Sequence, residues 1–163
     1  MTAPIVRFAG EHEFLSSFYP HPFRLPRLDH LFPTAEHAFQ CAKAVSVLDY
    51  QKILKAPTAA AAKRAGRSAG CREDWEQIRH RVMLDVLLAK FASPAMAVRL
   101  AATGDAVLVE GNTWGDDHWG AVTFESGLTR LPLWNCQDEG GRVRVLAGEN
   151  WLGRLLMMVR EVG

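Results

Sequence analysis

The stretch Phe32–Val45, FPTAEHAFQCAKAV, predicts the helix around which the rest of the chain is organised. Thr34 suits the N-cap of this helix, because its hydroxyl can accept a hydrogen bond from an early backbone N–H. At about 100° per residue, Glu36, Gln40 and Lys43 share one polar stripe. Such a stripe can point into a cleft and act on a small polar substrate; the alternative is a solvated face with a weak Glu–Lys ladder. The predicted apolar face comprises Ala35, Ala38, Phe39, Ala42 and Val45.

Length and composition are those of an ordinary globular chain. With 163 residues, of which 48% are hydrophobic and 23% charged, the chain can bury a sizeable core without a disulfide or metal staple. We therefore expect residues 1–163 to form a single domain. The formal net charge is +1, so nothing global favours wrapping of a nucleic-acid backbone, and any anion site must be local.

The cysteines indicate a reducing compartment. Cys41, Cys71 and Cys136 are odd in number and far apart, which favours neither a disulfide framework nor a thiolate zinc site. The N-terminus lacks the apolar core of a secretory signal, and no apolar run is long enough to span a bilayer. We therefore expect a soluble, cytoplasmic protein that does not associate with a membrane.

Helical periodicity recurs along the chain and strand patterns are few and short, which predicts a mainly α fold with a minor α+β component. The predicted helices are 49–55 with Asp49 as its cap, 58–66 with Thr58 as its cap and Gly66 as its end, 74–91, 93–102, and one that begins at Asn150. The predicted strands are 5–8, 107–109, 121–125 and 143–147, the last two as a pair.

A basic segment follows the central helix. The sequence KRAGRSAGCR places Lys63, Arg64, Arg67 and Arg72 around a predicted turn. Arginine forks bind phosphate in a bidentate manner, so this cluster is a candidate phosphate site. The alternative is that these cations only complement the dipole at the end of a helix.

Three further parts of the sequence carry candidate binding residues. Residues 11–25, EHEFLSSFYPHPFRL, read as a loop-rich wall whose aromatic side chains, including Phe18, either line the core or stack on a flat heterocycle. Trp75 opens a predicted helix beside the basic segment, where it either joins the core or borders a pocket. Residues 111–120, GNTWGDDHWG, read as a glycine-rich loop that presents Asp116 and its neighbours.

The ordered series of fragments resembles the NADAR family, also called YbiA-like proteins, over nearly the whole chain. The fragments are FLSSFYPHPF, FPTAEHAFQCAKA, AGR with REDWEQIRHRVM, LAKF, LAATGDAVLVEGNTWGDDHWG and GENWLGRLLMMVR. The resemblance implies a compact, mainly helical fold and an N-glycosidase that cleaves the bond between ribose C1 and a nitrogen of a base. Family members are described as hydrolysing phosphorylated ribosylamino-pyrimidine intermediates of riboflavin synthesis, or as removing ADP-ribose from guanine in DNA.

Carried over by motif, the resemblance implies functional roles for Glu36, Lys43, Trp75 and Asp116. We expect Glu36, Lys43 and Asp116 to be catalytic, with no metal and no cofactor. The expected substrate is a small-molecule N-riboside or ADP-ribosylated guanine in single-stranded DNA, without an obligate protein partner. The expected substrate-binding residues are Gln40, Trp75, Phe18, Arg64, Arg67, Arg72, Asn112, Trp119 and Asn150.

The chemistry of an N-ribosidic bond explains this choice of residues. Its cleavage builds positive charge on the sugar and negative charge on the departing base, so a carboxylate and a proton source are needed. We expect Glu36 and Asp116 to stabilise the cation, to orient a ribose hydroxyl or to activate water. Lys43 is then a candidate nucleophile that forms a Schiff base with C1, and the alternative is a purely acid–base route.

The chain departs from the family pattern in two segments. The part between Glu110 and Trp119 is one residue longer than in the bacterial form, which leaves the choice between Asp116 and Asp117 open. Residues 121–148 are also longer and are expected to form a hairpin over the site.

Three other functions fit parts of the sequence. One is a non-catalytic module that binds ADP-ribose or a nucleotide, and another is a scaffolding role. The third is a metal-dependent hydrolase that uses His37, Asp116, Asp117 and His118, which the absence of an HExxH motif disfavours.

Overall fold

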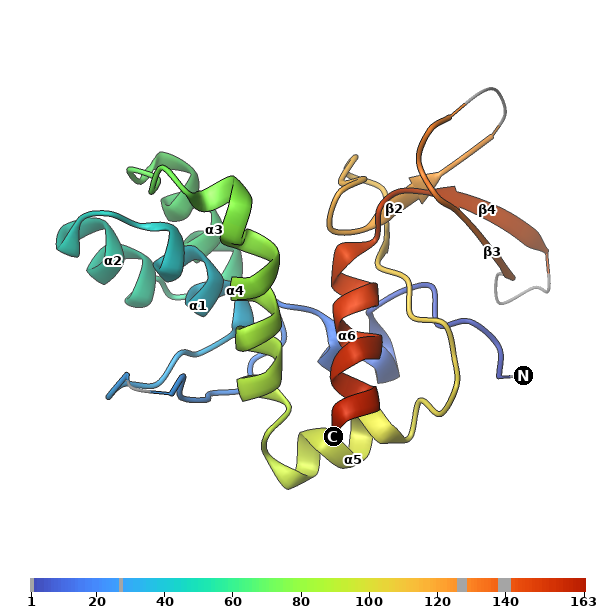
Figure 1. Ribbon diagram of the computed structural model, residues 1–163, viewed down its shortest axis with the longest axis horizontal. Coiled ribbons are helices and arrows are strands. Elements are labelled where there is room, and N and C mark those ends of the chain that lie inside the picture. Colours follow the sequence, from blue (N-terminus) through green and yellow to red (C-terminus); the bar gives the residue numbers. More distant parts are fainter. Residues whose placement is uncertain (1, 27, 126–128, 138–141) are drawn as a thin grey trace. The chain divides into compact units, whose positions relative to one another are not determined.

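The computed structural model describes residues 2–26, 28–125, 129–137 and 142–163, and Figure 1 traces the chain. The chain divides into two compact units, which are described one at a time. One unit comprises Ser17–Met96, and the other comprises Met1–Ser16 and Ala97–Gly163. Helices dominate and the strands form one small sheet, so the predicted mainly α fold class is confirmed.

The unit Ser17–Met96 is a cluster of helices around the predicted central helix (Figure 1). The side chain of Thr34 accepts a hydrogen bond from the backbone N–H of His37 at 3.2 Å, which confirms the predicted N-cap. The first helix packs against the other three, and the core between them includes Phe32, Ile53 and Val86. The helices are α1 (Ala35–Lys43), α2 (Val47–Leu54), α3 (Ala59–Ser68) and α4 (Trp75–Lys90).

Helix α1 differs from the prediction in its length and in its surroundings. It ends at Lys43, so Val45 lies beyond the helix and is exposed instead of joining the apolar face. Every residue from Ala35 to Cys41 is buried, including Glu36 and Gln40. The alternative of a solvated polar face is therefore wrong, because neighbouring helices cover α1 on several sides.

The other helices of this unit were predicted with errors at their ends. Ser46, not Asp49, caps α2, since its hydroxyl accepts from the backbone N–H of Asp49 at 3.0 Å. Thr58 caps α3 as predicted. Gly66 does not end α3, which continues to Ser68, and instead lies buried inside the helix. The buried face of α4 is Trp75, Met83, Val86, Leu87 and Lys90.

The other unit contains the small sheet. Its strand order is β1-β2-β4-β3; β1 and β2 are parallel, and the other neighbours are antiparallel. The predicted pairing of residues 121–125 with 143–147 is confirmed, with Val122 opposite Ala147. The strands are β1 (Gly111–Asn112), β2 (Ala121–Thr123), β3 (Leu133–Gln137) and β4 (Val143–Ala147).

The remaining strand predictions were less accurate. Strand β3 was not predicted. It pairs along its whole length with β4, which is the antiparallel pairing of a hairpin within residues 121–148, and residues 126–128 and 138–141 of that segment lie outside the described part. The expected position of this hairpin over the site stays a prediction. Instead of strands at 5–8 and 107–109, the structure has one isolated parallel bridge, from Ile5 to Leu108. The other helical elements are η1 (Gly10–Leu15), α5 (Pro94–Ala101) and α6 (Trp151–Val162).

Among the described residues, none of the helices combines the length and the apolar character that crossing a bilayer requires.

Candidate functional site

The side chain of Glu36 is held inside the helical unit with a partner on each carboxylate oxygen. Glu36 is only 5% exposed. Gln40 Nε2 donates to Oε1 at 2.8 Å, and Ser17 Oγ donates to Oε2 at 3.1 Å. The backbone N–H of Glu36 also donates to the carbonyl of Ser17 at 2.9 Å. No ion pair of Glu36 is found among the residues that the structure describes, so neutral donors alone fix this carboxylate.

The local sequence explains this arrangement. Glu36 and Gln40 are four residues apart, which places their side chains one above the other on a helix. Glu36 also lies in the first turn of α1, directly after the capped start. The unpaired N–H groups and the helix dipole favour negative charge there. The start of the helix therefore stabilises the negative charge of Glu36, which has no cationic partner among the described residues.

Lys43 lies at the other end of the same helix and is half-buried. Its carbonyl accepts from the backbone N–H of Arg72 at 3.1 Å. In the described part of the chain, neither an ion pair nor a hydrogen bond joins the Lys43 ammonium to Glu36. The predicted stripe therefore exists, but only Glu36 and Gln40 are in direct contact.

His37 has a structural role between these residues. It is 1% exposed, Nε2 lies 3.0 Å from the carbonyl of Ala56, and Nδ1 lies 2.8 Å from Thr34 Oγ1. Both ring nitrogens thus face oxygen partners, which removes His37 from the ligand set of the metal-hydrolase alternative. The described residues also contain no cluster of three or more His, Cys, Asp or Glu suited to a metal ion.

The aromatic candidates of this unit have different surroundings. The rings of Trp75 and Phe39 lie 4.9 Å apart between centroids, and Trp75 is 7% exposed. Trp75 is thus a core residue packed against the helix that carries Glu36. Phe18 is 38% exposed, with Lys63 Nζ placed 5.6 Å from its ring centroid. Phe18 and Lys63 together present an aromatic face and a cation at the surface.

The basic candidates do not surround a turn as predicted. Arg64 and Arg67 are exposed on α3 itself, because that helix does not stop at Gly66. Arg72 lies beyond the helix, where Nε and Nη2 donate to the two carboxylate oxygens of Asp74 at 2.6 and 3.0 Å. These hydrogen bonds hold the pKa of Asp74 below its ordinary value. The guanidinium fork of Arg72 is therefore already occupied by a carboxylate.

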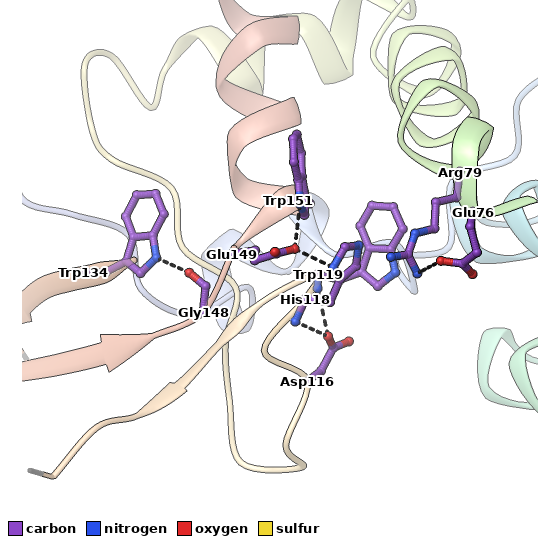
Figure 2. A network of polar contacts seen from close by, with 9 residues as sticks. All are labelled: Glu76, Arg79, Asp116, His118, Trp119, Trp134, Gly148, Glu149 and Trp151. Carbon is purple, nitrogen blue, oxygen red and sulfur yellow. Dashed lines mark hydrogen bonds and ion pairs between the residues drawn. The ribbon is translucent and has the colours of Figure 1, made fainter. Parts of the chain in front are cut away.

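In the other unit, Asp116 organises the loop between β1 and β2 (Figure 2). Its Oδ1 accepts from the backbone N–H groups of His118 and Trp119 at 3.2 and 2.9 Å. Asn112 is bonded to both the N–H and the carbonyl of Asp116, at 3.1 and 2.7 Å. Asp116 is half-buried, whereas Asp117 is exposed. The structure therefore ties Asp116 into the loop in a way that it does not tie the Asp117 side chain.

The same loop contacts the start of the last helix. His118 Nδ1 lies 2.6 Å from Glu149 Oε2, which also accepts from Trp151 Nε1 at 2.9 Å (Figure 2). The rings of His118 and Trp119 meet edge to face with centroids 5.2 Å apart. Trp119, a predicted binding residue, is thus held beside a charged and aromatic cluster.

Asn150, where the last helix is predicted to begin, occupies the N-cap position of α6, but its side chain makes no capping hydrogen bond. It has a left-handed backbone with φ of 52° and is fully buried. Its Oδ1 accepts from the backbone N–H of Glu110 at 3.0 Å, and its Nδ2 donates to the carbonyl of Leu108 at 2.9 Å. The carboxamide therefore ties Leu108 and Glu110, which precede β1, to the start of α6.

One broad, open concavity lies in this second unit. It is bordered by the N-terminal segment, the end of α5 and the sheet, and it includes Asn112 and the exposed Trp114. Asp116 and Trp119 do not line it. The concavity therefore does not by itself identify the second half of the predicted site.

The predicted catalytic residues are divided between the two units: Glu36 and Lys43 belong to one and Asp116 to the other. Sequence reasoning missed Ser17, which completes the shell around Glu36. The only sequence signal for Ser17 was the serine pair at positions 16 and 17, inside the aromatic segment 14–23. Nothing in the sequence shows that this segment lies against the start of α1.

Comparison with known proteins identifies the family. The family model of the NADAR domain matches residues 7–162. The chain is 33% identical over 165 residues to N-glycosidase YbiA of Shigella flexneri, covering 99% of this chain and 89% of the relative. An N-glycosidase of Nostoc punctiforme is 30% identical over 152 residues, or 90% and 82% of the two chains. The protein belongs to the NADAR family.

Two further comparisons define its extent and fold. A riboflavin biosynthesis protein of Vibrio vulnificus is 35% identical over 153 residues, which cover 92% of this chain but only 35% of that relative. The chain thus spans about a third of that longer protein and most of the YbiA proteins. The NMR structure of Escherichia coli YbiA matches with a TM-score of 0.72 at 30% identity, covering 99% of this chain and 86% of that one.

Proposed function

We propose that this protein hydrolyses the bond between ribose C1 and a base nitrogen, with Glu36 as the carboxylate that stabilises the transition state. The observation that carries the proposal is the buried Glu36 side chain, with a donor on each oxygen, at the capped start of α1 in a NADAR-family chain. A carboxylate that is already oriented and desolvated stabilises a developing sugar cation without reorganising during the reaction.

The reaction balances without a cofactor. The bond between C1 and nitrogen breaks, the electron pair leaves with the base, water adds to C1, and the proton released by water reaches the base nitrogen. Positive charge on C1 and the ring oxygen is the charge that Glu36 faces in this proposal. Asp116 is proposed as the second acidic group, acting on water or on a ribose hydroxyl.

Lys43 offers a second route for the same net reaction. In that route Nζ attacks C1 as the base departs, the opened sugar forms a Schiff base, and water later releases it. Borohydride reduction during turnover tests this route by mass spectrometry. A trapped adduct of the wild type that disappears in Lys43→Ala supports the lysine nucleophile, whereas turnover without an adduct leaves only the acid–base route.

Two substrate classes fit the proposal: a phosphorylated ribosylamino-pyrimidine and ADP-ribosylated guanine in single-stranded DNA. Relatives named N-glycosidase and riboflavin biosynthesis protein support the first class. Exposed Arg64 and Arg67 on α3 are proposed to contact a phosphate of either substrate, with Phe18 and Lys63 beside a base. With a net charge of +1, we expect a locally held group and not an extended nucleic-acid strand.

Base release measured by mass spectrometry tests the proposal. The two substrates are offered in parallel to the wild type, to Glu36→Gln, and to Glu73→Gln, which changes an exposed carboxylate of the same unit. We expect release by the wild type and the control, and a fall of about 100-fold or more in Glu36→Gln, the size typical for the loss of one electrostatic group. If the folded wild type binds both substrates but releases base from neither, a binding module replaces the proposed enzyme.

A further inference from the structure

Gly66 occupies a position where the local backbone does not require glycine, because the residue is helical and has no positive φ. It lies inside α3 and is buried. Glycine in a helix interior is about 1 kcal/mol less favourable than alanine. An alanine Cβ at this position would lie 2.0 Å from Gln40 Oε1 and 2.7 Å from Gln40 Cδ. Gly66 therefore leaves the space that the Gln40 side chain fills.

The Gln40 side chain that fills this space makes a hydrogen bond to Glu36, and its placement also costs free energy. Its Nε2 donates to Glu36 Oε1 at 2.8 Å. Its Oε1 is buried and, in the described part of the structure, has no hydrogen-bond partner. An unsatisfied buried polar atom costs about 1–3 kcal/mol. An apolar side chain at position 40 would avoid this cost, so packing alone does not account for a glutamine.

We infer that Gly66 is a positioning residue for the proposed hydrolysis: by leaving room for Gln40, it fixes the carboxylate of Glu36 in its working orientation. The inference rests on the proposed role of Glu36. Ser17 holds the other oxygen, so a displaced Gln40 leaves the carboxylate fixed on one side only. Gly66 contacts Gln40 and acts through it.

Kinetics of four variants separate positioning from simple packing. Gly66→Ala forces Gln40 out of its place, and Gln40→Ala removes the amide without a clash. The double variant Gly66→Ala/Gln40→Ala removes both the clash and the amide. Gly70→Ala is the matched control, because its added Cβ meets only the end of the Val45 side chain at 2.9 Å and the carboxylate of Asp49 at 4.0 Å.

We expect kcat to fall about 100-fold in Gly66→Ala, the effect of a misplacement of roughly 1 Å at a catalytic group, with KM nearly unchanged. The double variant should regain the thermal stability lost in Gly66→Ala but not kcat, and Gly70→Ala should match the wild type. If kcat returns together with stability in the double variant, Gly66 serves packing only and the inference is wrong.

A second readout needs no turnover. At neutral pH, the NMR chemical shift of the Glu36 side-chain carboxyl carbon should change in Gly66→Ala and in Gln40→Ala, since each variant loses the donor to Oε1. It should not change in Gly70→Ala. An unchanged chemical shift in Gly66→Ala overturns the inference whether or not the protein is active. A wild type that releases no base, while Gly66→Ala changes this chemical shift, refutes the proposed function and leaves the Gly66 contact established.

Discussion

Replacing Ser17 with alanine tests the geometry of the Glu36 site most directly. The change removes the hydroxyl that donates to Glu36 Oε2 at 3.1 Å and leaves the backbone contact in place. A hydrogen bond to a charged group contributes about 1.5–3 kcal/mol. For a chain of this length, each kcal/mol shifts the melting temperature by about 2–4 °C. We therefore expect Ser17→Ala to melt roughly 3–12 °C below the wild type.

Circular dichroism at neutral pH measures this shift, and Ser68→Ala is the matched control. The Ser68 hydroxyl is exposed and lies 3.5 Å from a carbonyl oxygen, so its loss should change little. A double-mutant cycle with Glu36→Gln adds the decisive comparison. Against the neutral amide, Ser17→Ala should cost only about 0.5–1.5 kcal/mol, the size of a neutral hydrogen bond.

Two results would refute this reasoning. The first is a melting temperature of Ser17→Ala equal to that of Ser68→Ala, which would mean that the Ser17 hydroxyl does not stabilise the folded state. The second is an equal cost of Ser17→Ala with Glu36 and with glutamine at that position, which would mean that the carboxylate charge is not involved. Activity measured on the same variants should fall with the loss of the hydroxyl, by about 10-fold or more.

Three further predictions concern other parts of the chain. Burial raises the pKa of the Cys41 thiol from 9.0 to about 12, so in a thiol-reagent titration of the native protein at pH 8 only the exposed Cys71 should react quickly; rapid reaction of two or three thiols contradicts this. Burial also raises the pKa of Tyr50 from 10.0 to about 12. Both groups are neutral when protonated, and the unfolded chain loses these protons at a lower pH than the folded protein. The stability that this difference contributes is therefore complete below pH 9 and is lost as the pH rises toward 12. Thermal melts from pH 8 to 11 should record a steady decline of the melting temperature. Asp116→Asn should lower the rate of base release by about 10-fold or more, because an amide cannot take the proposed acid–base role of Asp116, whereas Asp117→Asn should stay within about 2-fold; the reverse order of the two variants would reassign the acidic residue.

Much of the helical structure could be predicted because its signals are local. Thr34 and Thr58 cap their helices through contacts three residues away. The apolar period of α4 locates that helix from Trp75 to Lys90. Helix ends were less predictable: the glycine signal at Gly66 was overridden by its packing against Gln40, a contact between two helices.

Strands were harder to predict because their partners are distant. Ile5 pairs with Leu108, which is far away in the sequence. Strand β3 pairs with β4, although the sequence of β3 carries no strong strand pattern. A short run of residues does not contain the information that another run lies beside it. The pairing of β2 with β4 was predicted correctly because both runs are rich in β-branched residues.

The sequence by itself determined which side chains of the candidate site share a helix. The spacing of Glu36 and Gln40 brings them into contact wherever that helix is placed, since four residues complete about one turn. Only the tertiary structure decided that this contact is buried, that Ser17 completes it, and that Gly66 makes room for it. The physical reason is that burial and steric exclusion arise between segments that are far apart along the chain, and their relative placement is a property of the folded protein.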